Sequence, residues 1–159
     1  MSEMDLRMKA ARVAGQADLR DIRTAALHAE VDFPPQPGSN LGYDLDSNFE
    51  FALPQDEGDL TVVMGQYTAS LSVKEGDEKK EFARLGFTLM ALYEVGTPQG
   101  DAFSHEELEA FVRTSGQFAL YPYARETMSM LTTRLGVPNL TLPVLRVALD
   151  KDEVQRALD

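Results

Sequence analysis

The sequence predicts an α+β protein in which four antiparallel strands are followed by helices. Four segments between residues 22 and 95 either alternate apolar with polar side chains or are rich in β-branched residues. Residues 104–135 instead follow a helical period. With 159 residues, the chain is long enough for one domain with a sizeable core and too short for two ordinary ones.

The beginning of the chain predicts a helical arm over residues 3–18. Its apolar side chains recur three or four positions apart, as they do on one side of a helix. They form two stripes, Met4, Met8 and Ala11 on one and Leu6, Ala10, Val13 and Ala17 on the other. Gly15 weakens the pattern, so we expect a loosely held arm.

The first two strands surround a proline-rich loop. Residues 22–31 predict a strand, and residues 33–40 must form a loop because three prolines cannot sit inside a sheet. From Leu41 to Leu53, apolar side chains alternate with a second set that contains Asp44, Asp46 and Glu50. This period of two predicts a long, half-buried strand with one apolar and one acidic side.

Two more strands and two helices follow. Residues 60–73 are rich in Val, Thr and Tyr, residues 83–95 alternate, and the short turn 74–77 between them implies antiparallel pairing. Ser104 and Glu107 form a capping box, which predicts a helix from there to about Arg113. A second helix is expected over residues 118–135, where Gly136 and Pro138 stop it.

The second helix has two apolar stripes. One contains Leu120, Ala124, Met128, Leu131 and Leu135, and the adjacent one contains Tyr123, Thr127 and Met130. Only one stripe can pack on the sheet of the same protomer, so the other predicts a partner in a homo-oligomer.

The charge is strongly negative and unevenly distributed. Lys plus Arg is 15 and Asp plus Glu is 26, which gives −11 and argues against binding to nucleic acid or an anionic membrane surface. No Lys or Arg lies between Thr24 and Val73, where acids are frequent. Either this region is a solvated face, or it steers basic partners. No signal peptide or transmembrane run is recognisable, so we expect a cytoplasmic protein.

The chemistry of common active sites is missing from the sequence. Cys is absent, which excludes disulfides and thiolate chemistry, and the two histidines, His28 and His105, are read as ordinary side chains. No serine-nucleophile or phosphate-binding motif occurs. We therefore expect no enzyme, no cofactor and no metal. The surplus of aromatic and Met side chains suggests an oligomer, a groove for another chain, or both.

Residues 118–126, Phe-Ala-Leu-Tyr-Pro-Tyr-Ala-Arg-Glu, and the later Pro-Asn-Leu-Thr-Leu-Pro of residues 138–143 resemble SecB, the bacterial export chaperone family. Tyr-Asp-Leu-Asp at 43–46 and Thr-Ala-Ser-Leu at 68–71 add to the resemblance. Leu-Arg-Asp-Ile-Arg at 19–23, after a helical arm, looks closer to the SecB-like chaperones of some actinobacterial toxin–antitoxin pairs. The resemblance divides the chain into an arm (1–18), a chaperone domain (19–147) and a short acidic C-terminal helix or tail (148–159).

The resemblance implies a twisted four-stranded antiparallel sheet with helices on one face. It also implies a dimer of dimers, a homotetramer that sandwiches the helices. Unfolded polypeptides would bind in long apolar grooves. The residues that would line the groove are Phe33, Leu41, Tyr43, Tyr123, Met128, Met130, Val137, Leu140 and Leu142. Arg125 and Glu126 would be structural.

In SecB, the ATPase SecA docks on an acidic sheet surface. Carried over, the SecA-facing positions are Glu30, Leu71 and Glu75. At the positions of Ala26 and Val73, the family has an acid. The C-terminal tail of this chain is short. The resemblance therefore implies weaker SecA docking than in an export chaperone.

The sequence as a whole favours an ATP-independent holdase, a chaperone that keeps clients unfolded. The client would be either preproteins in export or one aggregation-prone antitoxin. The alternative is a small-ligand-binding or scaffold protein on the same α+β frame. Suppression of client aggregation would favour the holdase, and ligand-dependent thermal shifts would favour the alternative.

Overall fold

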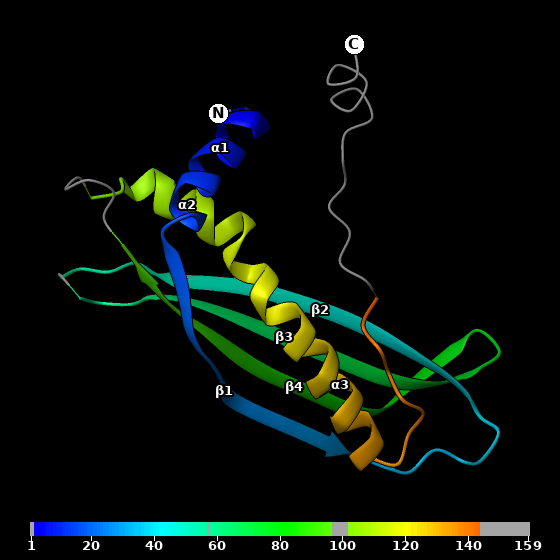
Figure 1. Ribbon diagram of the computed structural model, residues 1–159. Coiled ribbons are helices and arrows are strands. Elements are labelled where there is room, and N and C mark those ends of the chain that lie inside the picture. The colour runs from blue at the N-terminus through cyan, green and yellow to red at the C-terminus, as the bar shows by residue number, and fades with distance from the viewer. Residues whose placement is uncertain (1, 57, 97–101, 144–159) are drawn as a thin grey trace.

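The computed structural model describes residues 2–56, 58–96 and 102–143 (Figure 1). The elements in chain order are α1 (Glu3–Ala14), β1 (Ala17–Val31), β2 (Asn40–Ala52), β3 (Thr61–Glu75), β4 (Glu78–Val95), α2 (His105–Thr114), the 3₁₀ helix η1 (Gly116–Leu120) and α3 (Tyr121–Arg134). The four strands form one antiparallel sheet in the order β1-β4-β3-β2. The predicted fold class is confirmed. The helix or tail predicted for 148–159 lies outside the described residues.

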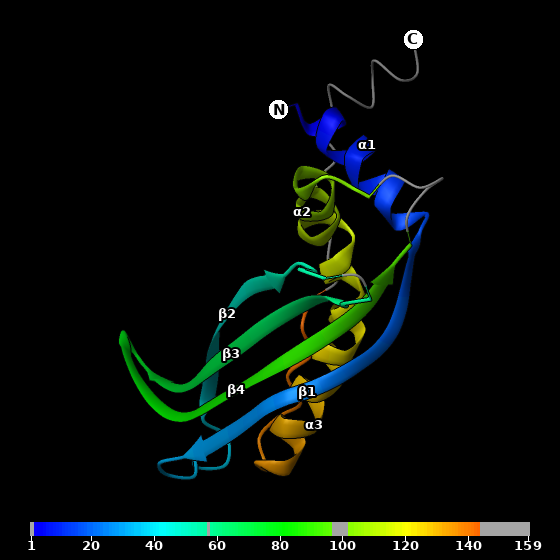
Figure 2. The same ribbon diagram turned by 90° about the vertical axis from the view of Figure 1, so that its left-hand side faces the viewer.

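One face of the sheet carries the helical layer. α3 crosses this face (Figure 1), and the turned view shows the helices on one side of the strands only (Figure 2). The odd-numbered side chains of the central strands point toward the helices and are buried, among them Val63, Tyr67, Phe87, Leu89 and Ala91. The inward stripe packs against them through Leu120 at the end of η1 and through Ala124, Met128 and Leu131 of α3. Of the two predicted stripes, this one packs on the sheet of the same protomer.

The first strand begins five residues earlier than predicted, at Ala17, and α1 ends correspondingly earlier, at Ala14. The pairing of β1 with β4 shifts register between Leu19 and Asp21 and again between Thr24 and Ala26. Each bulge moves the following side chains out of strict alternation. The period-two signal is therefore lost in the first half of this strand, although the strand continues through it.

The second predicted helix is divided into η1 and α3. Pro122 lies in the first turn of α3, where its missing N–H has no intrahelical partner to lose. The preceding residues form the 3₁₀ helix η1, and its first residue is fixed to the sheet because the hydroxyl of Tyr93 donates to the carbonyl of Gly116. A single helix over the predicted residues 118–135 would have placed Pro122 beyond its first turn.

The N-terminal arm is docked on α2. Ala10 and Val13 are buried, Lys9 pairs with Glu106 at 2.8 Å, and Arg12 pairs with Glu107. The predicted capping box is present, with Glu107 N–H donating to Ser104 Oγ and Ser104 N–H donating to Glu107 Oε2. That backbone hydrogen bond lowers the pKa of Glu107. Charge and apolar contact therefore hold α1 to the helical layer.

Candidate functional site

The edge strand β2 presents an apolar strip beside the helical layer. Its odd-numbered side chains share the helix-bearing face with the core of β3, since Tyr43 pairs with Leu71 and Phe49 pairs with Gly65. Tyr43 is 55% exposed and Phe49 is also exposed, while Leu41 and Leu45 are half-buried against the core. β2 therefore carries apolar surface that the protomer does not cover.

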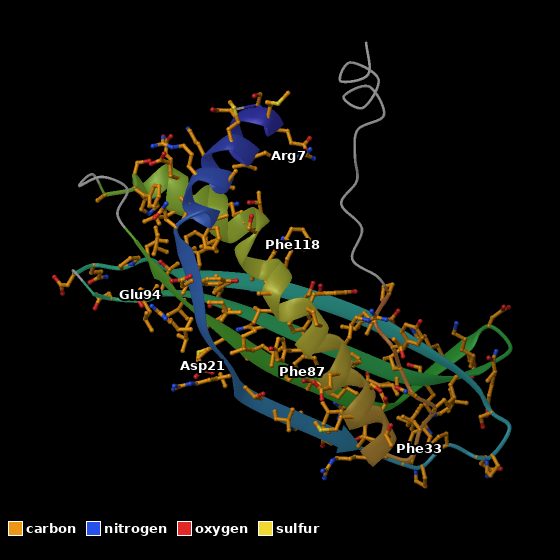
Figure 3. All side chains as sticks on the ribbon, in the orientation of Figure 1. Arg7, Asp21, Phe33, Phe87, Glu94 and Phe118 are labelled. Carbon is orange, nitrogen blue, oxygen red and sulfur yellow. The ribbon has the colours of Figure 1, made fainter. Side chains whose placement is uncertain are left out.

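The crossover loop extends this strip at one end of the sheet. Phe33 packs on Phe82, with ring centroids 6.1 Å apart, and Lys80 Nζ lies 4.5 Å from the Phe33 centroid. Phe33 and Val73 line a cavity of about 440 Å³, and Val73 pairs with Leu41 of β2. Figure 3 shows Phe33 toward the opposite end of the molecule from Phe118 and Arg7. The structure thus brings together three predicted groove residues, Phe33, Leu41 and Tyr43.

The predicted groove residues after α3 point into the core instead. Val137, Leu140 and Leu142 are buried, and the segment that carries them is anchored to α3. Leu140 N–H donates to Thr132 Oγ1 at 3.1 Å, and the Tyr121 hydroxyl donates to the Pro143 carbonyl. The side chains of these three residues therefore fill the protomer, and their place in a client groove stays a prediction.

The three α3 residues assigned to the groove also lie in two different environments, the core and the surface. Met128 is 0% exposed and belongs to the core of the protomer, and its place in a client groove stays a prediction. Tyr123 and Met130 are exposed and line a cavity of about 250 Å³ with Ile22 and Thr24 of β1. Since β1 and β2 are opposite edges of the sheet, Tyr123 and Met130 are not on the strip of β2.

The three SecA-facing positions do not share one surface. Glu30 lies on the face away from the helices, 3.4 Å from Arg84, which also binds Asp32 at 3.1 Å. Leu71 is buried on the helix-bearing face, and Glu75 lines the Phe33 cavity. Their SecA-facing role stays a prediction. Val73 is also buried, so an acid there would not be displayed to a partner.

The outer face of the sheet contains a charge cluster that sequence reasoning missed. Arg84 hydrogen-bonds Glu81 as well as Asp32, and the pKa of Arg84 is raised by these carboxylates. Ser70 donates to Glu81, which lowers the pKa of that carboxyl together with Arg84. Strand register brings Asp32 and Ser70 beside Arg84 and Glu81, so no local sequence motif predicts the whole cluster.

Three further features bear on function: a second cavity, possible metal sites and possible membrane spans. A second apolar cavity, about 540 Å³, lies between α1 and η1 and is lined by Leu6, Ala10 and Phe118 among others. Within residues 2–56, 58–96 and 102–143, no group of three or more acidic and histidine side chains could hold a metal ion. No helix in that part of the chain is long and apolar enough to cross a bilayer.

Comparisons with known proteins identify close likenesses. No protein-family profile matches the chain. The SecB-like chaperone Rv1957 of Mycobacterium tuberculosis is 38% identical over 156 residues, covering 90% of this chain and 85% of Rv1957, and the SecB-like chaperone MT2006 of a second strain matches equally. A solved structure of Rv1957 in complex with a ChAD peptide from the HigA1 antitoxin has a TM-score of 0.68 and 36% identity, covering 89% of this chain and 99% of that chain.

Proposed function

This chain belongs to the family of SecB-like chaperones, and from that premise we propose that it is an ATP-independent holdase whose client is an antitoxin. The observation that carries the proposal is the likeness, over most of both chains, to a SecB-like chaperone solved with an antitoxin peptide. The absence of a phosphate-cradling motif from the sequence supports ATP independence. We place the protein in the cytoplasm, where an antitoxin is made.

The client site that we propose is the strip formed by Phe33, Leu41 and Tyr43, extended by Phe49. These side chains are exposed or half-buried and follow one another along the crossover loop and β2. Apolar contact is non-directional, so such a strip binds unfolded chains with little regard to their sequence. The net charge of −11 keeps the loaded chaperone dispersed.

We propose a homotetramer as the working assembly. The outward stripe of α3 exposes Tyr123 and Met130, and the neighbouring edge strand exposes Leu27 and Val31. A cavity of about 250 Å³ lies between these two elements. Exposed apolar side chains on both a helix and the neighbouring strand support burial of this surface by a second copy.

SecA is a weaker candidate partner, and we propose that it docks less tightly here than on an export chaperone. Glu30 is already paired with Arg84, and Ala26 offers no charge. Since exposed acids mainly accelerate and select encounters with basic partners, fewer unpaired acids mean weaker steering. Titration calorimetry at two salt concentrations, with SecB of an export system as the reference, measures this difference.

The test of the holdase uses light scattering from an unfolded antitoxin diluted out of denaturant. We expect the full chain to suppress aggregation at a stoichiometric ratio without ATP. A Tyr43→Ser variant is expected to suppress it less, whereas Glu126→Gln, on α3, is expected to act like the wild type. Equal aggregation with and without the wild-type chain would reject the holdase. A thermal shift produced by a small metabolite would then favour the ligand-binding alternative.

A further inference from the structure

α1, the end of α2 and η1 enclose an apolar cavity of about 540 Å³. Leu6 and Ala10 line it from α1, and Phe118, which is 38% exposed, lines it from η1. A volume of that size holds an organic ligand or several apolar side chains. The cavity lies toward the opposite end of the molecule from Phe33 (Figure 3). It is therefore separate from the client strip proposed above.

The rim of this cavity is charged. Arg7 pairs with Glu3 at 2.5 Å within α1, and Arg113 pairs with Glu109 at 2.7 Å at the end of α2. Three of these four side chains, Glu3, Arg7 and Arg113, line the cavity. Ion pairs at exposed sites contribute little, so they can exchange partners at small cost. A segment that fits here carries apolar side chains with charges of both signs among them.

The last described residue lies close to this cavity. After α3 the chain returns along the helix (Figure 1), and the Tyr121 hydroxyl donates to the carbonyl of Pro143, the last described residue. Tyr121 is the first residue of α3, and Phe118 precedes it by three residues in η1, about 6 Å along a 3₁₀ helix. Residues 144–159 therefore start beside the cavity wall.

We propose that residues 144–159 dock in this cavity as an amphipathic helix. In their sequence, Val147, Val154 and Leu158 recur at spacings of seven and four, which place them on one side of a helix. A helix buries such a side against the nearest apolar surface, and the cavity is that surface. The inference goes beyond the proposed function, since it concerns a contact within the chain and does not depend on the client.

The same side of that helix carries charges that match the rim. Asp150 and Lys151 follow Val147 by three and four positions, so they lie among the apolar side chains. The rim offers two arginines and one glutamate to them. Opposite charges at the edge of an apolar contact mainly fix its register. The segment therefore matches the cavity in both apolar and charged side chains.

The tether favours this segment over other occupants. Because Pro143 is held at Tyr121, residues 144–159 reach the cavity at an effective concentration on the order of millimolar, as a short linker provides. A second copy of the chain at micromolar concentration would have to bind roughly a thousandfold more tightly to replace them. An unfolded client meets the same disadvantage.

Cysteine cross-linking in the full chain tests the docking. The chain contains no Cys, so an introduced pair has no competing thiol. One cysteine is placed in the cavity wall, as Leu6→Cys or Ala11→Cys. The second is placed either on the apolar side of the proposed helix or, as a matched control, on its opposite side: Val147→Cys or Val154→Cys against Asp152→Cys or Arg156→Cys.

A disulfide closes only where the two Cα atoms approach within about 7 Å. At least one apolar-side pair is therefore expected to close about tenfold faster than either control pair, at a rate that does not depend on protein concentration. Equal rates on both sides of the helix, or no closure at any position, would overturn the docking. Disulfides that join two chains would assign the cavity to a second copy and would overturn it as well.

A tryptophan reporter measures the same contact without cross-linking. The chain contains no Trp, so Phe118→Trp gives a single emission from the cavity wall. Val154→Asp with Leu158→Asp is expected to shift that emission to the red, because the carboxylates expel the segment and the indole meets water. Asp152→Asn with Arg156→Gln is expected to leave it unchanged. Identical emission from both double variants would overturn the docking, and a shift produced only by added unfolded antitoxin would give the cavity to the client instead.

Discussion

The hydroxyl of Tyr93 donates a 3.0 Å hydrogen bond to the carbonyl of Gly116 and so joins β4 to the start of the helical layer. The ring of Tyr93 also meets the ring of Phe111 edge to face, with centroids 5.1 Å apart. A side chain at Gly116 would be tight, since a Cβ there would lie 3.1 Å from Val63 Cγ2. Burial raises the pKa of Tyr93, so the phenol remains a donor. This contact sets how closely η1 approaches the sheet.

Removal of that hydroxyl is expected to destabilise the fold. Tyr93→Phe keeps the packing on Phe111 but leaves the buried Gly116 carbonyl without its donor, at a cost of about 1–2 kcal/mol. Urea denaturation at fixed protomer concentration measures it. Tyr43→Phe, which changes an exposed ring, is the control and is expected to leave the midpoint unchanged. Equal midpoints for both variants would show that the Tyr93 hydrogen bond does not stabilise the fold.

The two methionines of α3 are expected to respond oppositely to truncation. Met128 is fully buried between α3 and the sheet. Met128→Ala is therefore expected to lower the free energy of unfolding by about 2–5 kcal/mol, through lost packing and a residual cavity. Met130 is 39% exposed, and Met130→Ala is expected to change protomer stability by less than about 0.5 kcal/mol. Chemical denaturation of both variants decides it. Similar losses would contradict the division of α3 into an inner and an outer stripe.

Self-association is expected to depend on the outer stripe. Tyr123→Lys combined with Met130→Lys places two like charges on the surface that we propose a second copy covers, so the tetramer is expected to dissociate. Light scattering after gel filtration gives the mass. Tyr43→Lys, on the opposite edge of the sheet, is expected to leave the mass unaltered. A wild-type chain that is monomeric at micromolar concentration would reject the assembly.

Client capture and stability are expected to separate on substitution to Ser. Leu41→Ser with Tyr43→Ser is expected to weaken aggregation suppression while the protein stays folded, because apolar area supplies the affinity. Leu140→Ser is expected to lower the thermal midpoint, because Leu140 is buried and its backbone N–H is tied to Thr132. If Leu140→Ser instead reduced capture with no loss of stability, Leu140 would belong to the client site after all.

Acid pH is expected to weaken the docking of α1 on α2. The hydrogen bond from Lys9 lowers the pKa of Glu106, and the Ser104 backbone N–H lowers that of Glu107. Because both values are lower in the folded state, the carboxylates stabilise the fold fully above the ordinary glutamate pKa of 4.5, and this contribution is lost as the pH falls through the folded values. Stability therefore decreases toward acid.

The measurement compares thermal midpoints of the wild type with those of Glu106→Gln combined with Glu107→Gln across pH. The difference is expected to be largest near neutrality and to shrink as the pH falls below the ordinary glutamate pKa of 4.5. Glu50→Gln, on the exposed face of β2, is the reference and is expected to show no such trend. A difference that stays constant from neutral to acid pH would show that the two carboxylates do not act through their charge.

Local pattern was sufficient for most of the elements. The alternation from Leu41 to Leu53 predicts β2 to within a residue, and Ser104 with Glu107 predicts the start of α2, because period and capping are properties of neighbouring residues. The inner stripe of α3 was likewise readable, since helical spacing places Ala124 and Met128 on one side. The family resemblance came from contiguous motifs as well.

Tertiary structure decided which of the apolar residues remain open. Leu140 and Tyr43 look alike as groove candidates in the sequence, yet Leu140 is folded back into the core and Tyr43 stays exposed on the edge strand. The partners of Arg84 depend on register across β1 and β4, which no local pattern encodes. Burial and register are set by contacts between residues far apart in the chain. The sequence by itself therefore determined the elements and the family, while the fold determined which side chains can meet a client.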